Sequence, residues 1–325
     1  MFYMALFVFY NKNFWETSSM KIIKILMLGA TLVYAAMGVA IAADAKLKTF
    51  ILAEKTTGDV ASVTAATKTK LGKAGFEVVG EYSPYDTATI LIVTNDTLKA
   101  NAASSDFGAF GAAQRVTITK AGAEVQVAFT NPVYMSHAYR MKSDLSDVSS
   151  QLKSALGDMG EYGPDKGVTA KELRNYQYKW LMPYFDDLNE LADYGNQLIA
   201  IEKVEDALTK NNMGIKKVYR IDMQGKEETV IGVSMAGPDN VDCSGDKYIM
   251  GKIDFKKLKS TGHLPYEVVI SKGKVFALLA EFRIAISFPD LSMMGSNSFA
   301  SIMCAPTAIH EALTVGVGGE YNFDE

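Results

Sequence analysis

Apolar and polar residues alternate in short runs along much of the chain after residue 44, as expected for strands that bury one face. Residues 114–119 and 124–129 alternate on either side of a turn at Lys120–Ala123, which predicts a β-hairpin. The other elements predicted in the first half are strands at 48–54, 76–82 and 89–94 and helices at 58–74 and 144–156.

The second half repeats this order of elements with little literal identity. A helix over 188–212 comes first, residues 235–262 form an insertion, and a last helix spans 306–313. The matching pairs are strand 215–221 with 76–82, strand 229–234 with 89–94, and hairpin 266–287 with 114–129.

Between the halves, Gly160–Gly167 is a glycine-rich linker, and Thr169 with Glu172 forms the capping-box pattern of a helix start. Aromatic residues crowd the segment up to Leu188, which predicts an aromatic-rich helix broken at Pro183. The predicted fold class is therefore α+β, with two similar lobes, each a mainly antiparallel sheet flanked by helices. The lobes are expected at 43–160 and 195–325, joined by a helical connector at 161–194.

Three motifs in the first half point to a known family. They are Lys73–Val79 after the first helix, Ile90–Asn95 as a buried strand, and Phe129–Pro132 at the end of the hairpin. With them, residues 50–157 resemble the DUF302 family, a domain of unknown function. The resemblance implies a small, often dimeric α+β sandwich with no established activity, so it assigns no catalytic residue. Residues 195–319 are interpreted as a degenerate second copy.

The N-terminal segment is typical of an export signal. Lys21 and Lys24 precede a mainly apolar run that ends with small residues at Ala40 and Ala42, the pattern that signal peptidase cleaves. We predict that residues 1–42 are a signal peptide with its true start at Met20, and that the mature protein is periplasmic. An uncleaved anchor is the alternative, since a run of about 17 residues is near the lower limit for a span. No later segment predicts a membrane span.

Composition narrows the function classes. The chain has 325 residues, 48% of them apolar and 22% charged, as folded proteins do. Its net charge of −4 argues against a nucleic-acid partner. The two cysteines, Cys243 and Cys304, are too few for a disulfide framework or an iron–sulfur cluster. One disulfide between them is possible, and the sequence does not decide whether they meet.

A methionine and histidine cluster is the main candidate for chemistry. Met135, His137 and Met141 follow the strand end at Asn131, and His310 lies in the corresponding region of the second half, where methionines also gather. Thioether and imidazole groups suit Cu(I) or a pair of haem axial ligands, so these four residues are the predicted metal ligands. The alternative is that the methionines fill gaps in the core and the histidines bond to backbone carbonyls.

Catalytic motifs are missing from the sequence. There is no Gly-x-Ser-x-Gly elbow, and Cys304 and His310 fall on different faces of any shared helix. His263 is predicted to be exposed in a polar turn. We therefore predict a non-catalytic binding or interaction protein that holds a small ligand or a protein partner between the lobes. A periplasmic metal- or haem-binding electron-transfer protein is the alternative.

Overall fold

The computed structural model describes residues 45–237 and 242–322. The predicted signal peptide and the start at Met20 lie outside these residues. The described chain is α+β with antiparallel sheets, as the sequence predicts. The described residues from Lys46 onward form one compact unit, and one cluster of buried apolar residues extends through both large sheets. No helix among the described residues is long and apolar enough to cross a membrane.

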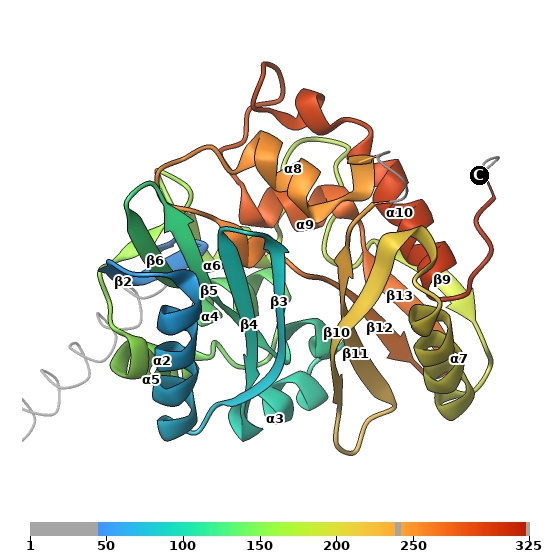
Figure 1. Cartoon of the computed structure of the whole chain (residues 1–325). Coiled ribbons are helices and arrows are strands. Elements are labelled where there is room, and N and C mark those ends of the chain that lie inside the picture. Colours follow the sequence, from blue (N-terminus) through green and yellow to red (C-terminus); the bar gives the residue numbers. More distant parts are fainter. Residues whose placement is uncertain (1–44, 238–241, 323–325) are drawn as a thin grey trace, which may run out of the picture. The chain divides into compact units, whose positions relative to one another are not determined.

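The first large sheet has the strand order β3-β4-β5-β6-β2-β7 (Figure 1). Helices α2 and α5 pack against each other and against this sheet. Its strands are β2 (Phe50–Thr56), β3 (Glu77–Tyr85), β4 (Ala88–Thr94), β5 (Gln114–Ala121), β6 (Glu124–Thr130) and β7 (Glu161–Tyr162). The helices of this half are α2 (Val60–Lys73), α3 (Asp96–Ser104), η1 (Gly108–Gly111), α4 (Pro132–Ala138) and α5 (Ser146–Leu156).

The second large sheet has the order β10-β11-β12-β13-β9. Its strands are β9 (Leu188–Asp193), β10 (Ile215–Asp222), β11 (Glu228–Met235), β12 (Tyr266–Ser271) and β13 (Lys274–Leu278). Its helices are α7 (Gln197–Thr209), η2 (Asn212–Gly214), η3 (Asp242–Ser244), α8 (Asp246–Ile253), η4 (Thr261–His263), α9 (Ala280–Ser287), η5 (Phe299–Ile302) and α10 (Ala305–Gly316). A two-stranded ribbon of β1 (Lys46–Leu47) and β8 (Val168–Thr169) precedes α6 (Ala170–Arg174).

The two large sheets share their strand order. In each sheet, a first strand is followed by a helix and then by four further strands. The first strand pairs with the last of these four, β2 with β6 and β9 with β13. Two irregularities coincide as well, whereas the register shift between Tyr82 and Tyr85 in β3 has no counterpart in β10. Val79 and Val218 are the extra residues of matching β-bulges in β3 and β10, and Ala53 and Leu191 are those in β2 and β9. Because bulges are retained within families, these matching bulges allow the two sheets to be aligned residue by residue.

The sheets meet at their edge strands β3 and β10, which lie side by side (Figure 1). The contact is close at Gly80. A Cβ atom there would lie 2.8 Å from the Cβ of Tyr219 and 2.8 Å from the carbonyl oxygen of Val218. The backbones therefore approach because residue 80 has no side chain.

The helix predicted over 169–188 is wrong beyond its first turns. The capping box of Thr169 and Glu172 is present, but α6 ends at Arg174. The aromatic residues that follow pack one by one: the Tyr176 hydroxyl donates to the Ala285 carbonyl (3.1 Å), and Phe185 contacts the rings of Phe110, Tyr139 and Phe282. Residues 161–194 therefore do not form the helical connector that was expected.

The helix predicted over 188–212 is also wrong at its start, because Leu188–Asp193 is strand β9. Its bulge explains the error. The extra residue sets the apolar positions Leu188 and Leu191 three residues apart, a spacing that is typical of a helix. Only α7, from Gln197 to Thr209, is helical.

The second-half insertion and the last helix are joined covalently. Cys243 and Cys304 form a disulfide that links η3 to the start of α10, which answers the question that the sequence left open.

Candidate functional site

A buried charge cluster lies between the sheets. Arg115 of β5 and Glu267 of β12 form an ion pair, and Nε of Arg283 of α9 lies 3.4 Å from the second carboxylate oxygen of Glu267. All three side chains are almost fully buried. The strand pairings place Arg115 and Glu267 at equivalent positions of the two sheets, so opposite charges occupy matching sites and neutralise each other. Burial, and then the charge of Arg283, lower the pKa of Arg115.

His263 lies beside this cluster and is fully buried, which corrects the prediction that it is exposed. Its Nδ1 lies 3.0 Å from Oγ of Ser287, and its Nε2 lies 3.1 Å from the Tyr266 hydroxyl. Burial, together with the charges of Arg283 and Arg115, holds the pKa of His263 well below its ordinary value. The imidazole is therefore neutral near pH 7.

The contact between Ser287 and His263 resembles a catalytic dyad only in composition. The Ser287 hydroxyl donates to the Arg283 carbonyl (3.1 Å) and accepts from Nη1 of Arg283 (3.2 Å). Because that hydroxyl has a single proton, all of these contacts are satisfied together only when Nδ1 of His263 donates to Ser287 and Nε2 accepts from the Tyr266 hydroxyl. An imidazole that donates to the serine cannot accept its proton, so this network does not activate Ser287 as a nucleophile.

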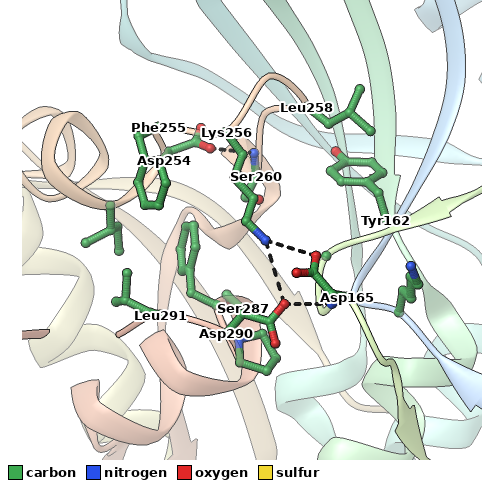
Figure 2. Close-up of a pocket in the computed structure, with 15 residues that line it drawn as sticks. Tyr162, Asp165, Asp254, Phe255, Lys256, Leu258, Ser260, Ser287, Asp290 and Leu291 are labelled. Carbon is green, nitrogen blue, oxygen red and sulfur yellow. Dashed lines mark hydrogen bonds and ion pairs between the residues drawn. The ribbon is translucent and has the colours of Figure 1, made fainter. Parts of the chain in front are cut away.

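A pocket of about 220 Å³ opens next to this network. Three segments form it: residues 253–260 after α8, residues 287–291 after α9, and residues 162–165 at and after β7 (Figure 2). Lys48 also lines it. Its apolar lining consists mainly of Tyr162, Ile253, Phe255, Leu258, Phe288 and Leu291.

Lys256 ties the three segments together. Its Nζ lies 3.4 Å from Oδ1 of Asp165 and 3.6 Å from Oδ2 of Asp290, and the backbone N–H of Asp165 donates to Asp290 (2.6 Å). Figure 2 shows these interactions converging on Asp165 and Asp290. The lysine and both carboxylates are substantially exposed, so the ion pairs contribute little stability, and their effect is to orient the segments.

Asp254 is the buried charged group of the pocket. The residue is 8% exposed, and its Oδ1 accepts the backbone N–H of Ser260 (3.0 Å). No ion pair to its carboxylate is found in the described part of the chain. Burial raises the pKa of Asp254 to about 6, against the lowering effects of the Ser260 hydrogen bond and the Lys259 charge. A carboxylate with a raised pKa that lines a cleft is typical of a functional site.

In the first half of the chain, aromatic side chains occupy the region that corresponds to the pocket edge at Ser287. Tyr139 lies nine residues after the end of β6, as Ser287 does after the end of β13. Tyr139 packs against Phe110 and Phe185, whose ring centroids lie 6.5 Å and 5.6 Å from its own. An aromatic ring thus occupies the position that corresponds to the pocket-lining Ser287, and two further rings pack against it.

The structure places the predicted metal ligands among protein groups. Met135 and Met141 are buried, and the Met141 sulfur packs against Gly111 and lies 3.9 Å from the Asn101 amide nitrogen. Nδ1 of His137 lies 3.4 Å from Nη1 of Arg174.

His310 is in α10, where its ring contacts Tyr321. Burial is the main cause that lowers the pKa of both His137 and His310. No group of three or more His, Cys, Asp or Glu side chains suited to a metal is found among the described residues. Metal or haem binding by Met135, His137, Met141 and His310 stays a prediction.

The sequence did not single out Asp254, Lys256 or Asp290. Asp254 and Lys256 belong to the stretch at 235–262, which stands apart in the sequence as an insertion, and that was the available signal. No family model matches the chain, and no curated protein or solved structure matches it.

Proposed function

We propose that the protein is an exported binding protein that holds a small ligand in the pocket between Tyr162, Asp254 and Phe288 without catalysing its conversion. The observation that carries this proposal is the pocket itself, whose lining combines apolar side chains with the buried Asp254. The non-catalytic part is supported by the hydrogen-bond directions around Ser287, which leave no activated nucleophile at its edge.

Two further features support the rest of the proposal. Export is favoured by the leader pattern at 20–42 and by the disulfide of Cys243 and Cys304, since such bonds persist in oxidising compartments. We also propose that the second sheet is a second copy of the DUF302-like unit. The shared strand order and the two coincident bulges support a duplication.

Ligand binding is tested with six small probes: benzylamine, benzyl alcohol, benzoate, hexylamine, hexanol and hexanoate. We expect at least one to raise the melting temperature, because a ligand that binds only the folded state stabilises it. Leu258→Trp fills the pocket and abolishes the shift, whereas Leu198→Trp, at an exposed position of α7, retains it. The proposal fails if no probe binds or if binding survives Leu258→Trp.

A further inference from the structure

The charges of the pocket define the class of ligand. Five charged side chains line it: Lys48, Asp165, Asp254, Lys256 and Asp290. Lys256 already pairs with Asp165 and Asp290. Asp254 and Lys48 remain without an ion pair to their side chains in the described structure, so they are the groups able to bind a charged ligand.

Of these two groups, Asp254 is the more buried. At 8% exposure its carboxylate has lost most of its hydration, whereas Lys48 keeps more contact with solvent. A charge that enters the pocket gains more from a desolvated partner than from a hydrated one, because the local dielectric constant is lower. The pocket therefore favours a cation.

The charged and titratable groups around Asp254 do not form an ion pair with its carboxylate in the described structure. The ammonium of Lys259 donates to the backbone carbonyl of Asp254 at 2.8 Å. Burial raises the pKa of Tyr85 to about 12 and that of Tyr162 well above its ordinary value, so both phenols are neutral. Asp246, at the start of the same helix, is buried, and its own carboxylate accepts the backbone N–H of Met235 (3.0 Å).

We propose that the ligand is an amphipathic amine, whose ammonium group binds Asp254 and whose apolar body lies against Phe288, Leu291 and Tyr162. This inference rests on the proposed ligand-binding function and specifies its ligand class. A pocket of about 220 Å³ accommodates an aromatic ring or a short alkyl chain together with the ammonium group. The hydrogen bond from Ser260 keeps the carboxylate in place before the ligand arrives.

The test compares an amine, an alcohol and a carboxylate that share one apolar body. The three benzyl compounds form one set and the three six-carbon compounds the other, and within each set only the polar group and its charge differ. We expect benzylamine and hexylamine to bind at least about tenfold more tightly than the matching alcohols and carboxylates, by calorimetry or equilibrium dialysis at pH 7.5. Asp254→Asn retains the acceptor for Ser260 and removes the charge. It weakens amine binding at least about tenfold and changes alcohol binding little. Asp106→Asn, at an exposed loop position, is the matched control and leaves both unchanged.

The pH profile separates a charge interaction from a change of shape. Asp254 must be ionised to bind an ammonium group, so amine affinity rises from pH 5 to pH 7 with a midpoint near the pKa of about 6. In Asp254→Asn this rise is absent. If the alcohols or carboxylates bind as tightly as the amines, or if Asp254→Asn leaves amine binding unchanged, the amine inference is wrong while the binding function stands. If none of the six probes binds, the binding function itself fails.

Discussion

At the scale of single residues, the charge cluster between the sheets governs stability. Glu267 accepts from both Arg115 and Arg283, whereas Arg283 has further partners in the carbonyls of His263 and Pro265. Nε of Arg115 is buried without a hydrogen-bond partner among the described residues. The carboxylate is therefore the member whose loss leaves the most charge uncompensated.

We expect Glu267→Gln to lower the free energy of unfolding by about 3–5 kcal/mol, because two guanidinium groups remain buried without a counter-charge. Arg115→Met costs less than half as much, since Glu267 keeps Arg283 and an apolar side chain fills the space. Urea denaturation measures both changes. Arg220→Met, which removes the ion pairs of an exposed arginine with Asp222 and Glu205, is the control at below about 1 kcal/mol. A larger loss for Arg115→Met than for Glu267→Gln would contradict this account.

At the scale of elements, the bulges and the edge strands decide how the two sheets are built and where they meet. The bulge at Leu191 shifts the inward positions of β9, and the absence of a side chain at Gly80 lets β3 approach β10. Neither effect depends on local propensity, so strand prediction from alternation fails at β9 and cannot place the contact between the sheets.

Two glycine substitutions test the contact between β3 and β10. Gly80→Ala places a Cβ against Tyr219 and Val218, so we expect a loss of about 1–3 kcal/mol in the free energy of unfolding. Gly72→Ala, in α2, meets no atom within 4 Å and is expected to stabilise by about 0.5–1 kcal/mol, because alanine loses less backbone entropy in a helix. Equal effects of the two substitutions in chemical denaturation would show that the edges do not pack as described.

At the scale of the whole molecule, the disulfide closes a long loop. Cys243 and Cys304 are 61 residues apart, and the bond joins the insertion to α10. Closing a loop of this length restricts the unfolded chain and stabilises the fold by up to about 4 kcal/mol on the chain-entropy model.

We expect reductant to lower the melting temperature of the wild-type protein and to leave a Cys243→Ser/Cys304→Ser variant unchanged. Thiol titration is expected to find no free thiol in protein exported with residues 20–42, and two in leaderless protein made in a reducing cytoplasm. Equal thiol content in both preparations would count against the export proposal, and equal melting temperatures with and without reductant would remove the stabilising role of the bond.

The sequence by itself determined the α+β class and most of the strands and helices, because alternation, caps and turn residues act locally along the chain. It correctly placed the hairpin of β5 and β6, the strands β10 and β11, and the capping box at Thr169. It also led to an exposed His263, a long helical connector and a hairpin that extends to residue 287, and the structure corrects all three. Strand β13 ends at Leu278, and Ala280–Ser287 is helix α9.

Only the tertiary structure decided which distant residues meet. Arg115 and Glu267 lie 152 positions apart, and the pocket joins segments near residues 48, 163, 256 and 289. Such contacts depend on how two sheets and their connecting segments pack, and no local pattern encodes that packing. Nothing in the sequence distinguishes Asp254 from an ordinary surface aspartate. Its burial in the tertiary structure is what makes its carboxylate a candidate binding group.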